Sequence, residues 1–173
     1  MMSRRGFLGG VLGAGAAGGA VAATDRTRPP KGDPDPKTIP DYDDWQLSDA
    51  QWRERLTEEQ FYVLRKEGTE RAGTSPLDKV YEDGVYACAG CGLDLFTSEM
   101  KFNSGTGWPS YFDFIPGTLG TKTDYKLVFP RTEYHCARCG GHQGHVFNDG
   151  PSPTGLRYCN NGVALTFKPA SEA

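Results

Sequence analysis

The sequence lacks a long run of strongly apolar residues. The uncharged stretch Gly9–Ala23 has about 15 residues and is diluted by glycine and alanine, whereas a membrane-spanning helix needs roughly 20 apolar residues. We therefore expect no stable membrane anchor once this stretch is removed. A retained N-terminal anchor is the alternative interpretation of the same stretch.

Positive charge is also scarce. Across 173 residues, 19 lysines and arginines face 22 aspartates and glutamates, and without residues 1–23 the net charge falls from −3 to about −5. The sequence contains no basic cluster. A nucleic-acid-binding domain normally carries a basic face that neutralises phosphates. Nucleic acid is therefore not an expected partner.

The N-terminal segment has the pattern of an export signal. Arg4 and Arg5 stand ahead of the uncharged stretch, which closes on small residues at Ala20–Ala23. The arginine pair followed by Phe-Leu resembles the twin-arginine translocation signal of bacteria, a route that carries folded proteins. We therefore predict that residues 1–23 are a removable signal. The mature protein is then expected to be periplasmic or otherwise extracytoplasmic in a bacterium.

The chain is long enough for one domain with a leader and too short for two ordinary domains. Residues 24–40 contain five prolines and no periodic apolar residues. This composition predicts an extended Pro-rich linker that buries no core. The single domain is expected to span residues 41–170.

Two short helices are expected near the start of this domain. Ser48 and Thr57 are each followed three residues later by a glutamine, which is the spacing of a capping box that opens a helix. We expect Gly68 to supply the left-handed residue that ends the second helix. Both helices are expected to pack on a sheet.

From Gly73 onward the pattern is β-like. Short apolar runs stand between turn residues at 85–87, 126–129 and 163–167, and each run predicts a strand. Because no helical segments separate these runs, parallel βαβ units are excluded. Residues 80–168 are therefore predicted to form a mainly β, antiparallel domain.

Four cysteines occur as two Cys-x-x-Cys pairs, each followed by glycine, at Cys88, Cys91, Cys136 and Cys139. Such a turn places two sulfurs on one side of a metal, and glycine tolerates the backbone angles that the turn needs. Two pairs complete a tetrahedral site with no open position, which predicts one structural zinc ion. Disulfides and a thioredoxin-like redox pair are the alternatives. A redox pair should open a helix, whereas Cys91 runs into Gly-Leu-Asp-Leu-Phe.

The fifth cysteine, Cys159, has polar neighbours. A period of two along residues 157–161 places Arg157, Cys159 and Asn161 on one face of a strand. A nearby cation is expected to lower the pKa of the thiol below its free value of about 8.5 and so to raise the reactive thiolate fraction. These features predict a working thiol. The alternative is a small buried hydrophobic residue.

Two further segments carry side chains suited to catalysis or binding. A glycine-rich loop follows the second cysteine pair and presents His142 and His145. These histidines suit proton transfer, although they are alternatively extra metal ligands or surface residues. Glycines and a proline around Trp108 predict a rigid loop, but a lone tryptophan can equally belong to the core.

Together these motifs resemble the peptide methionine-R-sulfoxide reductases. The resemblance covers residues 46–168 and rests on the cysteine pairs and on the segments Gly105–Ser110, His142–Pro151 and Arg157–Asn161. It implies a mainly β fold of two antiparallel sheets, with short N-terminal helices and the four-cysteine zinc site. The implied activity is protein repair after oxidative damage, by reduction of methionine-R-sulfoxide in oxidised proteins or peptides to methionine.

The resemblance also implies a role for each residue at the reacting centre. The cysteine that matches Cys159 attacks the sulfoxide sulfur and is left as a sulfenic acid. The residues that match His142, His145 and Asn161 bind the sulfoxide oxygen and assist its protonation, which chemistry requires because the oxygen must leave as hydroxide or water.

Supporting roles are implied as well. Trp108 matches the residue that forms the pocket for the substrate methyl group, and Arg157 and Asp149 match a supporting pair near the thiol.

Many members of that family carry a resolving cysteine at the position of Thr106. With four of the five cysteines assigned to zinc, we expect a one-cysteine cycle. An external small thiol or a thioredoxin-like protein then reduces the sulfenic acid.

Two other classes of protein stay open at this point. A zinc-stabilised binding module of similar β architecture needs no reactive thiol, so it predicts that position 159 tolerates substitution. A zinc-ribbon nucleic-acid binder conflicts with the negative charge of the mature chain.

Overall fold

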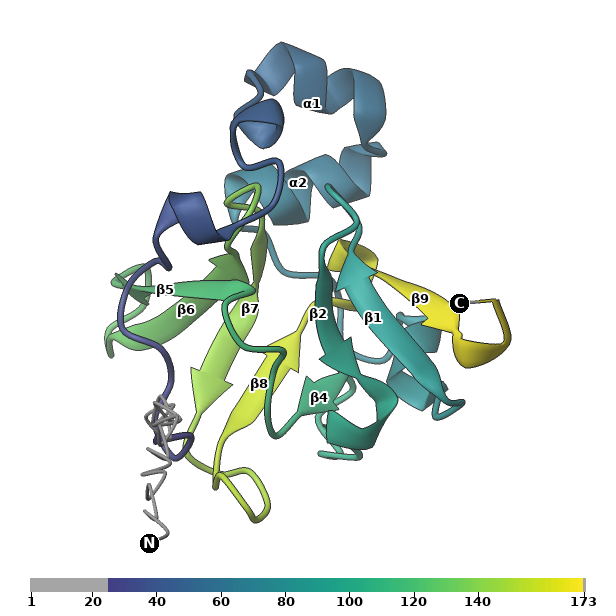
Figure 1. Cartoon of the computed structure of the whole chain (residues 1–173). Helices are drawn as coiled ribbons and strands as arrows, with labels where there is room; N and C mark the ends of the chain where they lie inside the picture. The colour runs from purple at the N-terminus through teal and green to yellow at the C-terminus, as the bar shows by residue number, and fades with distance from the viewer. Residues whose placement is uncertain (1–24, 173) are drawn as a thin grey trace, which may run out of the picture.

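The computed structural model describes residues 25–172, so the predicted export signal at 1–23 lies outside the described residues. No helix in this part of the chain is both long and apolar enough to cross a membrane. Two α-helices, α1 Asp49–Arg55 and α2 Glu58–Lys66, stand above the strands in Figure 1. The strands of the described part are β1 Gly84–Cys88, β2 Asp94–Thr97, β3 Lys101–Phe102, β4 Ser110–Tyr111, β5 Leu119–Asp124, β6 Arg131–Cys136, β7 His142–Phe147, β8 Arg157–Asn160 and β9 Leu165–Pro169. Short 3-10 helices lie at Pro36–Thr38, Asp43–Trp45, Pro76–Lys79, Ser98–Met100, Gly162–Ala164 and Ala170–Glu172.

The strands form two antiparallel sheets, which confirms the mainly β prediction. The smaller sheet has the order β2-β1-β9, and the larger sheet has the order β3-β4-β8-β7-β6-β5. All neighbouring strands pair antiparallel. In Figure 1 most of the larger sheet lies at the left and the smaller sheet at the right, with the two α-helices above both. β7 and β8 are central strands of the larger sheet, so the residues on them are held on both sides.

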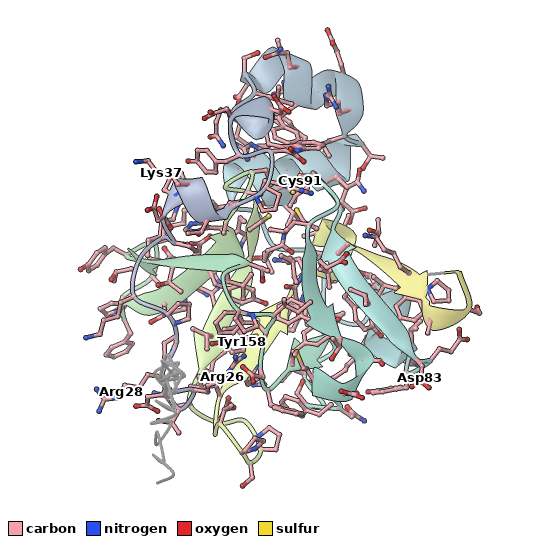
Figure 2. The ribbon with its side chains drawn as sticks, in the orientation of Figure 1. Arg26, Arg28, Lys37, Asp83, Cys91 and Tyr158 are labelled. Carbon is pink, nitrogen blue, oxygen red and sulfur yellow. The ribbon has the colours of Figure 1, made fainter. Side chains whose placement is uncertain are left out.

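An aromatic core joins the two sheets. Tyr86 and Phe96 of the smaller sheet and Tyr111, Tyr134 and Tyr158 of the larger sheet are all buried. The rings of Phe96 and Tyr111 stack with their centroids 4.0 Å apart. Figure 2 places Tyr158 near the middle of the domain. Because large rings in defined contact are costly to shift, this core fixes the position of β8.

Both predicted helix starts are confirmed, and the predicted helix end is wrong. Ser48 and Thr57 each accept a hydrogen bond from the glutamine three residues later, whose side chain accepts one in return. Glu67, not Gly68, takes the left-handed conformation, with a φ of 52°. Gly68 serves a different purpose, because a Cβ there would lie 2.2 Å from the ring of Tyr62.

The Pro-rich segment 25–40 lies on the domain, although the composition predicts a linker that buries nothing. The hydroxyl of Thr121 on β5 donates to the carbonyl of Pro30 over 2.6 Å, and its backbone N–H donates to the carbonyl of Gly32 over 3.2 Å. Ile39 is buried. The segment therefore covers part of β5, which is an edge strand of the larger sheet.

Two of the three strand predictions need correction. Residues 85–87 lie in β1 as predicted, and 165–167 lie in β9, but residues 162–164 form a 3-10 helix. The run 126–129 is not a strand, because it lies in the turn between β5 and β6. An apolar run predicts a strand only if a partner face buries it, and here the fold provides none.

Candidate functional site

The four cysteines of the two pairs meet in one buried cluster, called the four-cysteine cluster below. All four Sγ atoms lie within 4.8 Å of one another. The separation is 3.7 Å between the sulfurs of Cys88 and Cys139 and 3.5 Å between those of Cys91 and Cys136. Bonds of about 2.3 Å from four thiolates to one zinc ion place the sulfurs about 3.8 Å apart. A disulfide would instead need about 2.05 Å, and all five cysteines are free, so the cluster fits a structural metal site.

The same backbone hydrogen bond occurs in both cysteine pairs of the cluster. The N–H of Gly92 donates to the carbonyl of Cys88, and the N–H of Gly140 donates to that of Cys136, both over 2.8 Å. Both glycines have a positive φ, 73° and 67°. This confirms why a glycine follows each pair, since residues with a Cβ rarely adopt these angles.

Gln143 connects the four-cysteine cluster to the next strand. Its side-chain nitrogen donates to the Sγ of Cys88 over 3.3 Å, and its side-chain oxygen accepts from Asn160 over 3.3 Å. Its backbone carbonyl accepts from both the backbone and the side-chain amide of Asn161, each over 2.9 Å. Asn160 and Asn161 directly follow Cys159, so the cluster and the fifth cysteine share a hydrogen-bond network.

The fifth cysteine lies beside a cavity of about 120 Å³. Residues from the segment after α2, from the loop before β4 and from strands β6, β7 and β8 line this cavity. They are Thr69, Trp108, Arg131, Gly144, His145, Phe147, Cys159, Asn160 and Asn161. Cys159 and His145 stand opposite each other in the pairing of β8 with β7. Four predicted site residues, Trp108, His145, Cys159 and Asn161, therefore meet at one cavity.

The surroundings of Cys159 correct the predicted direction of its pKa. Burial raises the pKa of the thiol above its ordinary value, while the Arg157 charge and hydrogen bonding by Thr106 and Arg157 offset only part of that rise. Desolvation therefore outweighs the cation that the sequence places two residues away. At neutral pH the free protein holds Cys159 mainly as a protonated thiol.

Arg157 is held in place by two contacts. Its guanidinium makes a bidentate ion pair with Asp149, with both N–O distances 2.9 Å, and it lies over the ring of Phe147 at 4.4 Å from the centroid. The ion pair lowers the pKa of Asp149. The predicted association of Arg157 with Asp149 is therefore present, and it orients the cation that acts on Cys159.

His145 is fixed by a carboxylate. Its Nε2 lies 2.8 Å from Asp124 Oδ2, and Arg131 donates to the same oxygen over 2.7 Å. A backbone hydrogen bond from Lys126, together with His145 and Arg131, holds the pKa of Asp124 well below its usual range. An ionised carboxylate only accepts, so Nε2 of His145 carries the hydrogen. Burial lowers the pKa of His145, so the ring is neutral at neutral pH.

His142 stands behind His145 rather than at the cavity. Its ring centroid lies 5.4 Å from that of His145, and it is absent from the described residues that line the cavity. Its Nδ1 lies 2.7 Å from a carboxylate oxygen of Glu133, whose other oxygen lies 3.0 Å from Nδ1 of His135. Burial opposes ionisation of Glu133, but the two imidazoles lower its pKa to about 2. Nε2 of His142 is buried without a partner among residues 25–172.

Glu70 is a supporting residue that the sequence patterns do not indicate. Its carboxylate accepts from the N–H groups of Gly162 and Val163 over 2.6 and 2.9 Å. Its backbone N–H donates to the side-chain oxygen of Asn161 over 3.0 Å, and its carbonyl accepts from the indole of Trp108 over 3.2 Å. Burial raises the pKa of Glu70. Glu70, which follows α2, thus positions Asn161 and Trp108 of the cavity wall, although both are far from it in the sequence.

Comparisons with known proteins identify relatives of this chain. A family model described as the SelR domain matches residues 56–169. A protein of Agrobacterium fabrum is 54% identical over 123 residues, which are 70% of this chain and 91% of the relative. One of Methanosarcina barkeri is 51% identical over 126 residues, 72% of this chain and 89% of the relative. One of Leptospira interrogans is 49% identical over 122 residues, 70% and 93% of the two chains. Each of the three is named peptide methionine sulfoxide reductase MsrB.

Proposed function

The chain belongs to the SelR domain family, and from this membership we propose that it is an oxidoreductase that reduces methionine-R-sulfoxide in oxidised proteins and peptides to methionine. The observation that carries the proposal is the cavity wall, where Cys159, His145, Asn161 and Trp108 meet. A thiol, a neutral imidazole, an amide and an indole around one small cavity suit an apolar side chain that ends in a polar S–O group.

The reaction begins with attack by the sulfur of Cys159 on the sulfoxide sulfur. The attack forms an S–S bond, and the protonated sulfoxide oxygen leaves as water. Water then adds to the sulfur of Cys159 as the S–S bond breaks, so Cys159 becomes a sulfenic acid and the substrate sulfur, which has gained two electrons, leaves as the thioether of methionine. The sulfoxide oxygen must gain a proton as it leaves its sulfur. A thiol with a raised pKa keeps its own proton until substrate arrives, so the proton that Cys159 releases is available for that oxygen.

Asn161 is proposed to hold the sulfoxide oxygen with the second N–H of its side-chain amide, because the first donates to Gln143. In the free protein Nδ1 of His145 is an acceptor, because Nε2 donates to Asp124, so His145 is proposed to take up the proton that Cys159 releases and to donate it from Nδ1 to the sulfoxide oxygen, with His142 assisting from behind. Asp124 fixes the ring of His145, and Glu70 and Gln143 fix the amide of Asn161. Groups that are fixed before substrate binds need little reorganisation in the transition state. The indole of Trp108, anchored on the Glu70 carbonyl, is proposed to contact the substrate methyl group, since sulfur and aromatic rings attract each other.

The four-cysteine cluster is proposed to hold one structural zinc ion. The sulfur separations and the complete burial of the four ligands suit zinc with no open coordination position. The ion would supply rigidity rather than chemistry at the substrate. Metal analysis of the purified protein should find about one zinc per chain, and a Cys136→Ser variant should lose it.

We propose that the catalytic cycle uses one cysteine. Thr106 stands beside Cys159 where many relatives are expected to carry a second thiol, and the other four cysteines are buried in the cluster. Two molecules of an external thiol, or one thioredoxin-like dithiol, would reduce the sulfenic acid, with release of water and formation of a disulfide in the reductant. Mass spectrometry after one turnover without reductant should find one added oxygen on Cys159, whereas an internal disulfide would contradict the proposal.

The proposed location is the periplasm or another extracytoplasmic compartment of a bacterium, reached through residues 1–23. The support is the arginine pair Arg4-Arg5 ahead of an uncharged stretch. Fractionation of cells that express the full chain should recover a shortened protein outside the cytoplasm. Replacement of both arginines by lysine should retain the protein inside, and unchanged export would contradict the assignment.

One assay tests the activity itself. The purified protein with dithiothreitol should reduce a peptide that contains methionine-R-sulfoxide and should leave the S epimer unchanged. A zinc-stabilised binding module, the competing function, predicts no reduction of either epimer and no effect of Cys159→Ser.

A further inference from the structure

The turn between β5 and β6 exposes an unusual amount of apolar surface. Four of its six residues, 125–130, are large and apolar, and they are strongly exposed: Tyr125 by 76%, Leu127 by 59%, Val128 by 92% and Phe129 by 80%. This turn, called the apolar tip below, projects at the left of Figure 1. Contiguous exposed apolar side chains are uncommon on monomeric proteins and mark sites of interaction.

The base of the apolar tip belongs to the cavity wall. Asp124, the last residue of β5, contacts His145 over 2.8 Å, and Arg131, the first residue of β6, contacts Asp124 over 2.7 Å. Arg131 and His145 line the cavity beside Cys159. The apolar tip therefore begins at the wall of this cavity.

The apolar tip is also held in a defined position. The backbone N–H of Lys126 donates to Asp124 over 2.8 Å, and its ammonium group forms an ion pair with Glu67 over 2.7 Å. Glu67 stands two residues before Thr69, which lines the cavity. These contacts hold the first part of the turn close to the cavity wall, and the exposed side chains of Leu127, Val128 and Phe129 follow directly after it.

We propose that the apolar tip binds the residues that flank methionine sulfoxide in an unfolded segment of an oxidised protein, a proposal that rests on the function proposed above. Methionine is most often buried among apolar neighbours, and its oxidation to the polar sulfoxide disrupts such cores. The segment that needs repair therefore carries apolar residues that have lost their partners. The tip offers an apolar surface beside the cavity, whereas free methionine sulfoxide has no flanking residues to reach it.

The test compares three substrates with dithiothreitol as the reductant. They are free methionine-R-sulfoxide, a peptide with leucine and phenylalanine on either side of the sulfoxide, and the same peptide with serines in those places. The variant Leu127→Ser/Val128→Ser/Phe129→Ser keeps Asp124, Lys126 and Arg131. Tyr81→Ser removes a side chain that is 52% exposed and lies outside the cavity, so it serves as the matched control.

In the wild type we expect kcat/KM to be about tenfold higher for the apolar peptide than for the serine peptide. The triple variant should lose this preference through a higher KM, with kcat unchanged, because uniform binding changes KM alone. Its kcat/KM for free methionine sulfoxide should stay within about twofold of wild type, which also shows that the variant is folded. Tyr81→Ser should keep the preference.

Other outcomes overturn the inference. Equal kcat/KM values for both peptides in the wild type, or a preference that survives in the triple variant, would exclude the tip as the binding surface. The assay is repeated with a thioredoxin-like protein in place of dithiothreitol, and a defect of the triple variant seen only with that protein would assign the tip to the reductant instead. A dimer in sedimentation that the triple variant lacks would assign it to a second copy of this chain. If the wild type reduced none of the three substrates, the proposed function itself would fail.

Discussion

The four-cysteine cluster and the fifth cysteine, Cys159, lie in contrasting surroundings. The sulfurs of the four-cysteine cluster lie within 4.8 Å of one another and are buried, and glycines with positive φ hold the backbone around them. Cys159 is only partly buried, stands alone at a cavity and is surrounded by side chains from several strands. The comparison indicates that sulfurs crowded together serve structure, whereas an isolated sulfur beside fixed polar groups suits chemistry.

The sharpest test of this contrast removes the isolated sulfur. Cys159→Ser should lower sulfoxide reduction by at least about 1,000-fold, because a serine hydroxyl is a far weaker nucleophile than a thiol. The unfolding midpoint and the zinc content should match wild type. A variant that keeps a tenth of the activity would break the contrast, since Cys159 would then not be the reacting group.

The second test removes one sulfur of the cluster. Cys136→Ser should destabilise the domain by more than about 3 kcal/mol, because the binding energy of a structural metal contributes directly to folding. Urea unfolding with and without a chelator measures the loss. Activity should fall only as far as the folded fraction falls. A stable, metal-free variant with normal unfolding would show that the cluster is not a structural site.

A smaller effect is expected from the cation near Cys159. Arg157 lowers the pKa of a thiol that burial has raised, so Arg157→Met should raise that pKa further and shift the alkylation rate of Cys159 to higher pH. A shift of one pH unit reduces the thiolate fraction at pH 7 by about tenfold. The rate of iodoacetamide labelling as a function of pH measures the shift in the pKa of Cys159. Arg157→Lys, which keeps the charge, should shift the profile less, and an unshifted profile for Arg157→Met would contradict the assigned role.

The smallest effect is expected at Gln143, which connects the four-cysteine cluster to the strand of Cys159. Gln143→Met removes the donor to Cys88 and the acceptor of Asn160 with little change in volume. Both hydrogen bonds are long, and Asn160 keeps its bond to the carbonyl of Asn161, so their loss should cost about 1 kcal/mol. Urea unfolding gives the change in stability, and the rate of zinc loss to a chelator should increase. Unchanged values for both would mean that the cluster and the catalytic strand are independent.

The features that the sequence predicts well are local. The capping boxes at Ser48 and Thr57 and the glycine after each cysteine pair depend on residues within three or four positions. The errors at Gly68 and at 126–129 depend on contacts beyond that range, because Tyr62 packs over Gly68 and the fold leaves the turn after β5 without a covering face. Local rules do not contain this information.

The candidate site divides in the same way. Cys159, Arg157 and Asn161 are close in the sequence, so their association can be predicted from the spacing alone. Glu70 contacts Gly162 across 92 positions of the chain. Asp124 of β5 and Glu133 of β6 hold the histidines of β7 from other strands of the same sheet. Only the pairing of the strands brings these carboxylates to the site. The rise in the pKa of Cys159 is likewise missed because burial is a property of the folded chain.

The Pro-rich segment over β5 has a consequence for aggregation. An exposed edge strand offers free N–H and C=O groups to which a strand of another chain can add. Here Thr121 of that edge donates its hydroxyl to the carbonyl of Pro30 and its backbone N–H to the carbonyl of Gly32. Prolines have no N–H to donate, so the covering segment is itself a poor template for a further strand. For the unfolded, apolar segments that the apolar tip is proposed to bind, the covered edge at Thr121 removes one place where they could add to the sheet.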